Sequence, residues 1–245
     1  MLPSEVTGLL ALVGGDEFKP GNEEQDRLLV AAAKARGGPA YVVPTAAARG
    51  GPEQAVANAT RWFAGLGLQL EELHVLTRTH ANSEEVAAQA ERGSFFYLVG
   101  GDPGHTASTL RDSRVWRSME RTWHAGAALA GSSAGAMALG EWTLIRDRFK
   151  GDHRRQYRPA LAALPKVAVL PHFNSFGHRW VDSAGERAPV LDAVLLGIDE
   201  RSAAVWDGLG WSARGPGSVT VIRDGARTSS HSGEAVLGLP DPRAD

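Results

Sequence analysis

Gly131-Ser132-Ser133-Ala134-Gly135 centres a serine between two glycines and follows directly on the apolar run Ala127–Ala130. This pattern is typical of a nucleophile elbow, a sharp turn from strand to helix that lifts a serine hydroxyl above a sheet. The flanking residues must be small because such a turn is crowded. The helix expected over Ala134–Leu139 would direct free N–H groups and a partial positive charge at negative charge on a substrate. A glycine-rich turn that serves packing alone is the alternative that this motif leaves open.

Apolar runs and helical patterns alternate on both sides of this turn. The strand-like runs of the first half are Leu9–Val13, Tyr41–Val43, Leu73–Leu76 and Phe95–Val99, and the helical patterns are Glu23–Ala35, Pro52–Leu66, Ser83–Ala90 and Arg114–His124. Regular alternation predicts parallel strands joined by crossover helices, hence a three-layer α/β/α fold around a mostly parallel, doubly wound sheet. Ligands bind outside the carboxyl ends of strands in such sheets, where Gly14, Gly100 and Gly131 stand.

Composition favours one α/β domain over residues 1–245, because 245 residues with 43% hydrophobic content can form one large core. We expect the last stretch, 233–245, to be a peripheral tail. A net charge of −2 gives no reason to expect a nucleic-acid partner. The sequence has no apolar run of membrane-spanning length, and Met1–Gly15 lacks the charged start of a signal peptide. We therefore expect a cytoplasmic protein without a membrane partner, and the sequence leaves open whether it forms a homodimer.

Cysteine is absent, which excludes a disulfide framework, a thiolate zinc site and a cysteine nucleophile. His172 and His178 are six positions apart, which is no recognised spacing of metal ligands. We therefore expect no metal or other cofactor. Serine is the leading candidate for covalent catalysis.

The second half supplies chemical partners for Ser133. The strand candidate Val167–Leu170 carries His172 just beyond its end, and the run Leu195–Glu200 ends in two acids. A serine is unreactive near neutral pH unless a base takes its proton, and the base needs a third group to orient it. The chain therefore contains all three residue types that an activated serine requires, in the order serine, histidine, acid.

The identity of the acid stays open on these grounds. Asp199 and Glu200 are adjacent and would point to opposite faces of a strand, so only one of them can meet His172. Asp147, fourteen residues after Ser133, is a further candidate among basic residues that suggest an exposed loop. An order of Ser133, Asp147 and His172 would be that of an α/β-hydrolase such as an esterase.

Four blocks resemble, in order and approximate spacing, the motif blocks of the dipeptidase E and cyanophycinase family of serine peptidases: Phe95–Asp102, Gly131–Ala136, Leu170–Phe173 and Leu196–Ala203. The resemblance runs from Leu9 to about Ile222. It implies a flavodoxin-like fold related to the class I glutamine amidotransferases, with serine in place of their cysteine.

Carried over position by position, the resemblance makes Ser133 the nucleophile, His172 the general base and Glu200 the acid that orients it. The backbone N–H groups of Gly101 and Ala134 match the oxyanion hole, which must bind the tetrahedral intermediate better than the substrate carbonyl. The resemblance therefore favours Glu200 over Asp199 and Asp147.

Departures from the family pattern concern the substrate. Cyanophycinases carry a glutamine where this chain has Pro103, and arginines near the places of Phe176 and His178, so a cyanophycin-degrading role is not expected. Dipeptidase E cleaves dipeptides that begin with aspartate and needs a cation to hold that side chain. Arg179 and Arg187 are the candidates, since a guanidinium binds carboxylate in a bidentate manner.

His105 follows the Gly-Gly-Asp block and either lines the substrate pocket or caps the next helix. The resulting hypothesis is a serine peptidase of the dipeptidase E type that hydrolyses a small peptide through an acyl-enzyme. A more specific form of this hypothesis is that the peptide begins with an aspartyl residue. The alternatives are a family member of weak or no activity that binds a small ligand at the elbow, and an esterase of the α/β-hydrolase type.

Overall fold

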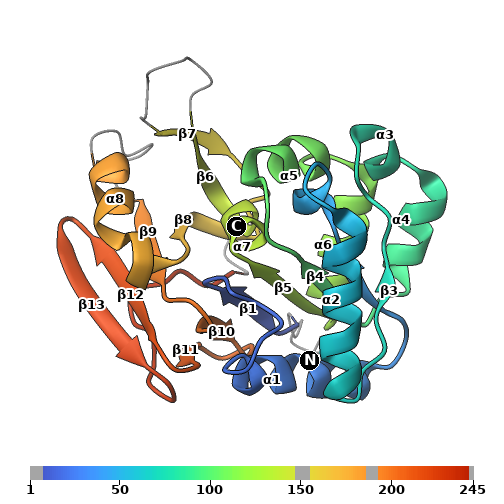
Figure 1. Cartoon of the computed structure of the whole chain (residues 1–245), viewed down its shortest axis with the longest axis horizontal. Coiled ribbons are helices and arrows are strands. Elements are labelled where there is room, and N and C mark those ends of the chain that lie inside the picture. Colours follow the sequence, from blue (N-terminus) through green and yellow to red (C-terminus); the bar gives the residue numbers. More distant parts are fainter. Residues whose placement is uncertain (1–7, 147–154, 186–192, 243–245) are drawn as a thin grey trace, which may run out of the picture.

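The structure, a computed structural model, describes residues 8–146, 155–185 and 193–242, and its strands form two sheets (Figure 1). The seven-stranded sheet has the order β11-β10-β1-β5-β4-β2-β3, with β1 Leu10–Val13, β2 Ala40–Val43, β3 Glu71–Glu72, β4 Phe95–Leu98, β5 Ala128–Ser132, β10 Ala203–Trp206 and β11 Trp211–Arg214. The six-stranded sheet has the order β13-β12-β9-β8-β6-β7, with β6 Gly140–Arg146, β7 Arg155–Pro159, β8 Leu164–Leu170, β9 Val194–Ile198, β12 Ser218–Arg223 and β13 Ala226–His231.

Helices separate and cover these sheets. Their bounds are α1 Glu23–Arg36, α2 Pro52–Gly65, α3 Arg78–Ala81, α4 Glu84–Glu91, α5 Pro103–Leu110, α6 Arg114–His124, α7 Ala134–Leu139 and α8 Phe173–Gly185. A short 3-10 helix, η1, spans Thr45–Ala47. None of the helices in the described part of the chain is long and apolar enough to cross a membrane.

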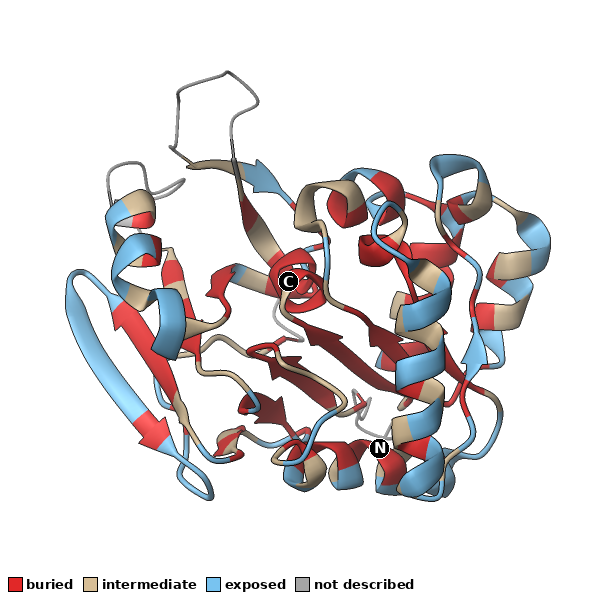
Figure 2. Ribbon diagram, viewed as in Figure 1, coloured by how far each residue is buried: buried red, intermediate tan, exposed pale blue. Residues whose placement is uncertain are grey.

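The alternation of side chains along β1 shows how the layers form. Leu10 and Leu12 face a core shared with α4, α6, α7 and the six-stranded sheet, whereas Ala11 and Val13 face a second core under α1 and α2. Strand residues alternate between the two faces of a sheet, so apolar residues at every position bury both faces. A third, smaller cluster packs α8 against the six-stranded sheet through Trp180. Figure 2 shows the central strands buried and the outer strand β13 mostly exposed.

The predicted α/β class is confirmed, and each of the two sheets has a parallel part. β1, β5, β4, β2 and β3 are parallel neighbours, and so are β6, β8 and β9. The alternation predicted one sheet, but the described strands form two. After residue 193 the five strands β9 to β13 follow one another without an intervening helix, and β10 pairs antiparallel with β1 and β11, as β12 does with β9 and β13.

The prediction of a strand at Leu73–Leu76 is wrong, because the strand in this region, β3, lies just before these residues. The pairing with β2 is made by Glu71 and Glu72, and the chain then leaves the ladder. Leu73 and Val75 are fully buried in the core without being in a strand, which explains why they read as an apolar run.

The segment predicted as a peripheral tail lies along β11 as far as it is described. The Val236 N–H donates to the Trp211 carbonyl at 2.9 Å, and the Trp211 indole donates to the Pro240 carbonyl at 2.9 Å. Val236 is buried. This part of the segment therefore contributes to the core, although Leu237 is exposed.

The sheets bring several carboxyl ends to one region. In the seven-stranded sheet the register places Val13 of β1 beside Ser132 of β5, and Leu98 of β4 beside Gly131. In the six-stranded sheet Leu170 of β8 lies beside Gly197 of β9. The loops after β1, β4, β5, β8 and β9 carry the candidate site.

Candidate active site

Ser133 stands at the junction of β5 and α7, in the turn that the sequence pattern predicted. Its backbone has φ 49° and ψ −110°, which is unusual for a residue with a side chain. A Cβ on Gly131 would lie 2.6 Å from the Gly135 carbonyl carbon, and one on Gly135 would lie 2.2 Å from the Leu98 carbonyl oxygen. Both flanking positions therefore exclude any larger residue, and the turn is held between its own helix and β4.

His172 follows β8 and reaches Ser133 directly. Its Nε2 lies 3.0 Å from the Ser133 Oγ. The His172 backbone has φ 50°, and its N–H donates to the Gly14 carbonyl at 2.7 Å. A Cβ on Gly15 would lie 2.3 Å from His172 Cε1, so the imidazole rests against a position that only glycine can fill. The loop after β1 thus fixes both the backbone and the ring of His172.

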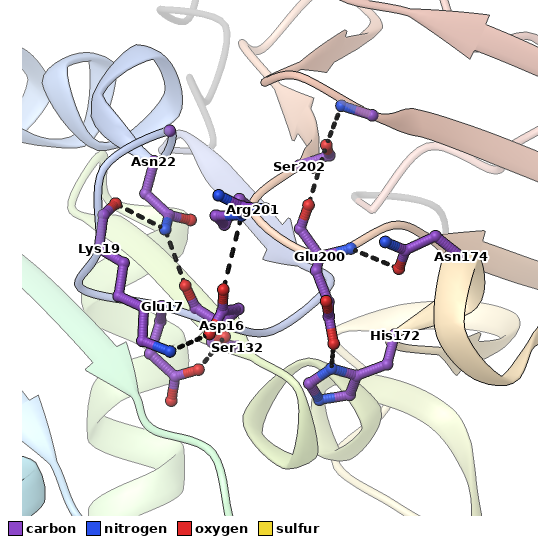
Figure 3. A network of polar contacts seen from close by, with 12 residues as sticks. Asp16, Glu17, Lys19, Asn22, Ser132, His172, Asn174, Glu200, Arg201 and Ser202 are labelled. Carbon is purple, nitrogen blue, oxygen red and sulfur yellow. Dashed lines mark hydrogen bonds and ion pairs between the residues drawn. The ribbon is translucent and has the colours of Figure 1, made fainter.

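Glu200 completes the chain of hydrogen bonds. Its Oε1 lies 2.8 Å from His172 Nδ1, and Figure 3 shows the carboxylate pointing at the ring. The Glu200 N–H donates to the Asn174 Oδ1 at 3.1 Å, and the neighbouring Arg201 N–H donates to the Gly15 carbonyl at 2.8 Å. The His172 and Glu200 side chains are about a quarter exposed, at 27% and 26%. The pair is therefore shielded from solvent but open to a small substrate.

Asp199 points elsewhere. Its Oδ2 accepts hydrogen bonds from the Ser218 N–H and hydroxyl, both at 2.9 Å. This carboxylate therefore ties β12 to the loop after β9. Asp147 lies outside the described residues, so the geometry favours Glu200 over Asp199 and leaves Asp147 uncompared.

Gly101 follows Gly100, whose added Cβ would lie 3.5 Å from the Ser133 Cβ, and Ala134 follows Ser133 directly. Gly101 has φ +144°, and a Cβ there would lie 2.1 Å from the Ala46 carbonyl oxygen. Ala134 is the first residue of α7. Among the described residues neither N–H has a hydrogen-bond acceptor, so both remain available to a ligand.

The loop after β4 borders two hollows. One, of about 460 Å³, is lined by Gly100, Gly101, Arg49 and the start of α2. The other, of about 330 Å³, is lined by Arg49, Asp102 and His105. The Arg49 guanidinium stands between them, with its Nη1 4.0 Å from the Asp102 Oδ2 and its side chain 66% exposed.

The remaining predicted residues have different positions. His105 lines the smaller hollow, and its Nε2 lies 2.9 Å from the Leu76 carbonyl oxygen. The cap of α5 is Asp102, whose Oδ1 accepts the His105 N–H at 2.9 Å, so His105 is the capped residue and not the cap. Arg179 is exposed on α8 and lines neither hollow, and Arg187 lies outside the described residues.

Two residues near the site were missed by the sequence reasoning. Arg49 lies in the loop after β2, and Glu17 lies in the loop after β1, where its carboxylate accepts the Gly100 N–H at 2.9 Å. A systematic reading of every charged residue that follows a parallel strand could have found both, because the carboxyl ends of these strands meet.

A buried carboxyl lies in the layer beneath the loop after β1. Burial raises the pKa of Asp26 to about 7, with a further contribution from the charges of Glu23 and Glu17, while a hydrogen bond from the Trp62 indole opposes the rise. That bond is 2.8 Å long. Burial also raises the pKa of Tyr97 well above its usual value, and the Asp26 and Glu17 charges add to this effect. Within the described residues no group of three or more His, Asp or Glu side chains is arranged to hold a metal ion.

Comparisons with known proteins identify relatives of the whole chain. The model of peptidase family S51 matches residues 9–208. The chain is 25% identical over 222 residues to a cyanophycinase of Synechococcus elongatus, which covers 88% of this chain and 68% of that protein. The crystal structure of a peptidase from an acI-B1 actinobacterium is 29% identical, with a TM-score of 0.79 and coverage of 95% of this chain and 97% of the other. A putative peptidase E from Listeria monocytogenes, 18% identical with a TM-score of 0.62 over 86% of this chain and 99% of its own, shares the fold.

Proposed function

This chain belongs to peptidase family S51 and is a serine peptidase; from this premise we propose that Ser133 is its nucleophile, His172 its general base and Glu200 the acid that orients the base. One observation supports the proposal most directly. The distances Ser133 Oγ to His172 Nε2, 3.0 Å, and His172 Nδ1 to Glu200 Oε1, 2.8 Å, form the continuous relay that an activated serine requires.

The first chemical step is acylation. His172 Nε2 takes the proton of the Ser133 hydroxyl as Oγ attacks the carbonyl carbon of the scissile peptide bond, which leaves the carbonyl oxygen negatively charged. The N–H groups of Gly101 and Ala134 donate to this oxygen, and the partial positive charge of the α7 N-terminus adds to their effect. Each such donor contributes on the order of 3 kcal/mol to stabilisation of the transition state. His172 then gives its proton to the leaving amine, and the C–N bond breaks.

The second step is hydrolysis of the acyl-enzyme. Water replaces the released amine, and His172 takes one of its protons as the oxygen attacks the ester carbonyl. The tetrahedral intermediate collapses, the proton returns to Ser133 Oγ, and the acid product leaves. Glu200 stabilises the imidazolium in both steps and holds the tautomer in which Nδ1 carries hydrogen.

We propose a small peptide with an acidic first residue as the substrate. The hollow beside Gly101, of about 460 Å³, is of a size for one or two residues rather than a folded protein. Arg49 is the cation on its wall, which makes it a better candidate for the substrate carboxylate than Arg179, which lines neither hollow. Peptides that begin with aspartate should therefore be favoured.

A fluorophosphonate probe tests the nucleophile. Wild-type protein should form one adduct, mapped by mass spectrometry to Ser133, and Ser133→Ala should form none. Ser175→Ala, which removes an exposed hydroxyl at the start of α8, is the matched control and should label at the wild-type rate. Absence of any adduct on the wild type would instead support a family member that only binds a ligand at the elbow.

A substrate panel tests the reaction class. Asp-Leu, Asn-Leu and Ala-Leu differ only in the first side chain, and p-nitrophenyl acetate reports esterase activity. We expect turnover of Asp-Leu above Asn-Leu and Ala-Leu. Turnover of the ester with no turnover of any dipeptide would favour the esterase hypothesis.

A further inference from the structure

Glu17 lies in the loop between β1 and α1 and joins two other loops of the site. Its Oε1 accepts the Gly100 N–H at 2.9 Å, and its Oε2 accepts the Ser132 hydroxyl at 3.0 Å. Figure 3 shows the bond to Ser132, with the Glu17 carboxylate turned away from the Asp16 cluster of the same loop. One carboxylate oxygen therefore contacts the loop after β4, and the other contacts the last residue of β5.

The two partners of Glu17 occupy special positions. Gly100 immediately precedes Gly101, and Ser132 immediately precedes Ser133 and Ala134. These are the segments that carry the proposed oxyanion donors and the proposed nucleophile. One carboxylate thus bridges the loop after β4 to the elbow after β5.

The packing around this bridge is close. A Cβ on Gly100 would lie 2.8 Å from the Glu17 Oε1 and 3.5 Å from the Ser133 Cβ. Glycine at positions 100 and 101 leaves the backbone of this loop free to rotate, and Gly101 stands at φ +144°, where other residues are rarely found. A charge-assisted hydrogen bond at Gly100 opposes that rotation and so restrains the direction of the next N–H, which belongs to Gly101.

We propose that Glu17 is a positioning residue of the oxyanion hole, which fixes the Gly100–Gly101 backbone against the elbow through its bonds to Gly100 and Ser132. The proposal rests on the proposed function, because it assigns Glu17 an effect on the oxyanion hole of that reaction. Glu17 acts through the backbone and touches neither substrate nor reacting atoms. Its role is geometric, so a neutral side chain of the same shape should replace it.

Glutamine provides that side chain. In Glu17→Gln the amide oxygen can still accept the Gly100 N–H, and the amide nitrogen can donate to the Ser132 Oγ. Glu17→Ala removes both contacts. A misplaced oxyanion donor weakens binding of the transition state more than binding of the substrate. We therefore expect Glu17→Ala to lower kcat about 100-fold and to change KM less than about threefold. Glu17→Gln should retain kcat within about fivefold of wild type.

The experiment measures kcat and KM on the best dipeptide, together with inhibition by the matching peptide aldehyde, which forms a tetrahedral adduct on the serine. Glu17→Ala should weaken the aldehyde about 100-fold and leave binding of the product amino acid unchanged. Glu23→Ala is the control, because its carboxylate belongs to the same region but accepts the Gly21 N–H instead. Thermal unfolding of each variant establishes that it is folded.

The outcomes separate this inference from the proposed function. A wild-type kcat in Glu17→Ala would overturn the positioning role, and so would an equal loss of kcat in Glu17→Gln and Glu17→Ala. Neither result would contradict the proposed function, which is tested separately by labelling of Ser133 in the wild type. If Glu17→Ala fails to fold, Ser132→Ala replaces it: loss of the other anchor should lower kcat about tenfold at unchanged KM, and full activity there would overturn the proposal.

Discussion

Steric contacts and hydrogen bonds hold the two sides of the site in different proportions. The nucleophile side, named for the proposed role of Ser133, is formed by the loops after β4 and β5 of the seven-stranded sheet. Close backbone contacts fix it at Gly101, Gly131 and Gly135, where a Cβ would lie 2.1–2.6 Å from another backbone atom, and the hydrogen bonds of Glu17 add to them. The base side, formed by the loops after β8 and β9 of the six-stranded sheet, is fixed by hydrogen bonds to His172 and Glu200. Steric exclusion tolerates no substitution, whereas hydrogen bonds can be rearranged.

Gly14 and Gly15 connect these sides. Their carbonyls accept the N–H groups of His172 and Arg201, at 2.7 Å and 2.8 Å, while β1 itself belongs to the seven-stranded sheet. A serine and a base supplied by different sheets can act together only if such a connection keeps their distance constant. The comparison thus predicts which substitutions abolish the reaction and which only weaken it.

The largest effect should come from separating the serine from its base. Ser133→Ala and His172→Ala should each lower kcat by about 10⁶-fold, and the double variant should lose no more than either, because the two groups act as one unit. Steady-state kinetics of the three variants on the best dipeptide measure this. Losses that multiply in the double variant would mean that the two sides work independently.

The next effect concerns the acid of the base side. Glu200→Gln should lower kcat about 10⁴-fold because the amide no longer stabilises the imidazolium, whereas Asp199→Asn should stay within about threefold of wild type. Asp199 serves Ser218 and not His172, which makes it the matched control.

The same kinetics should include Asp147→Asn. We expect full activity from it, since the resemblance assigns the acid to Glu200. Loss of activity in Asp147→Asn with normal turnover by Glu200→Gln would replace the proposed relay with that of an α/β-hydrolase.

The nucleophile side was largely predictable from the sequence. The residues around Ser133 are contiguous, and small residues around a serine have few other uses, so the motif predicted the turn and the bounds of α7, although β5 ends at Ser132, two residues beyond the apolar run Ala127–Ala130. The choice between Asp199 and Glu200 was harder. β9 ends at Ile198, so both acids lie in a turn where strand alternation does not apply, and the partner that occupies Asp199 is Ser218 on β12.

The roles of Glu17 and Arg49 could not be derived from local pattern. The bonds of Glu17 join residues 83 and 115 positions apart in the chain, and no periodicity encodes such a contact. The division of the strands into two sheets could not be predicted from the sequence for a related reason. The apolar runs of the second half look like those of the first, and only the lack of helices between them indicates antiparallel pairing.

A buried carboxyl should make the layer under the nucleophile side sensitive to pH. Asp26 has a pKa of about 7 when folded against a usual value of 3.8, so the unfolded chain ionises first and the free energy of unfolding falls as pH rises from about 4 to 7. Asp26→Asn does not titrate there. It should match wild type near pH 4 and exceed it by up to about 4 kcal/mol at pH 8.

Urea unfolding of the two proteins between pH 4 and pH 8 measures this difference. A constant difference across the range would show that Asp26 is ionised at no cost in the folded protein. The activity of Asp26→Asn at pH 8 serves as the check that the substitution leaves the site intact.

The connection between the sides should be weakened by Gly15→Ala. The added Cβ would lie 2.3 Å from His172 Cε1, at a backbone φ of +111°. The ring must move, and a displacement of about 1 Å costs about 100-fold in kcat. Gly37→Ala is the control, because that residue also has a positive φ, of +73°, but nothing within 4 Å of the added atom. It should cost about 1 kcal/mol in stability and leave kcat unchanged, whereas equal kcat in both variants would contradict the role of Gly15.

The smallest effect should decide which side recognises the substrate. Arg49 belongs to the wall beside Gly101, and Arg179 to the exposed face of α8 beyond His172. An exposed guanidinium that already faces Asp102 at 4.0 Å contributes modestly, so Arg49→Ala should reduce the preference for Asp-Leu over Asn-Leu about tenfold, through KM. Arg179→Ala should leave the preference unchanged. The reverse result would place substrate recognition on the base side. The nucleophile side would then contribute only to the chemical step.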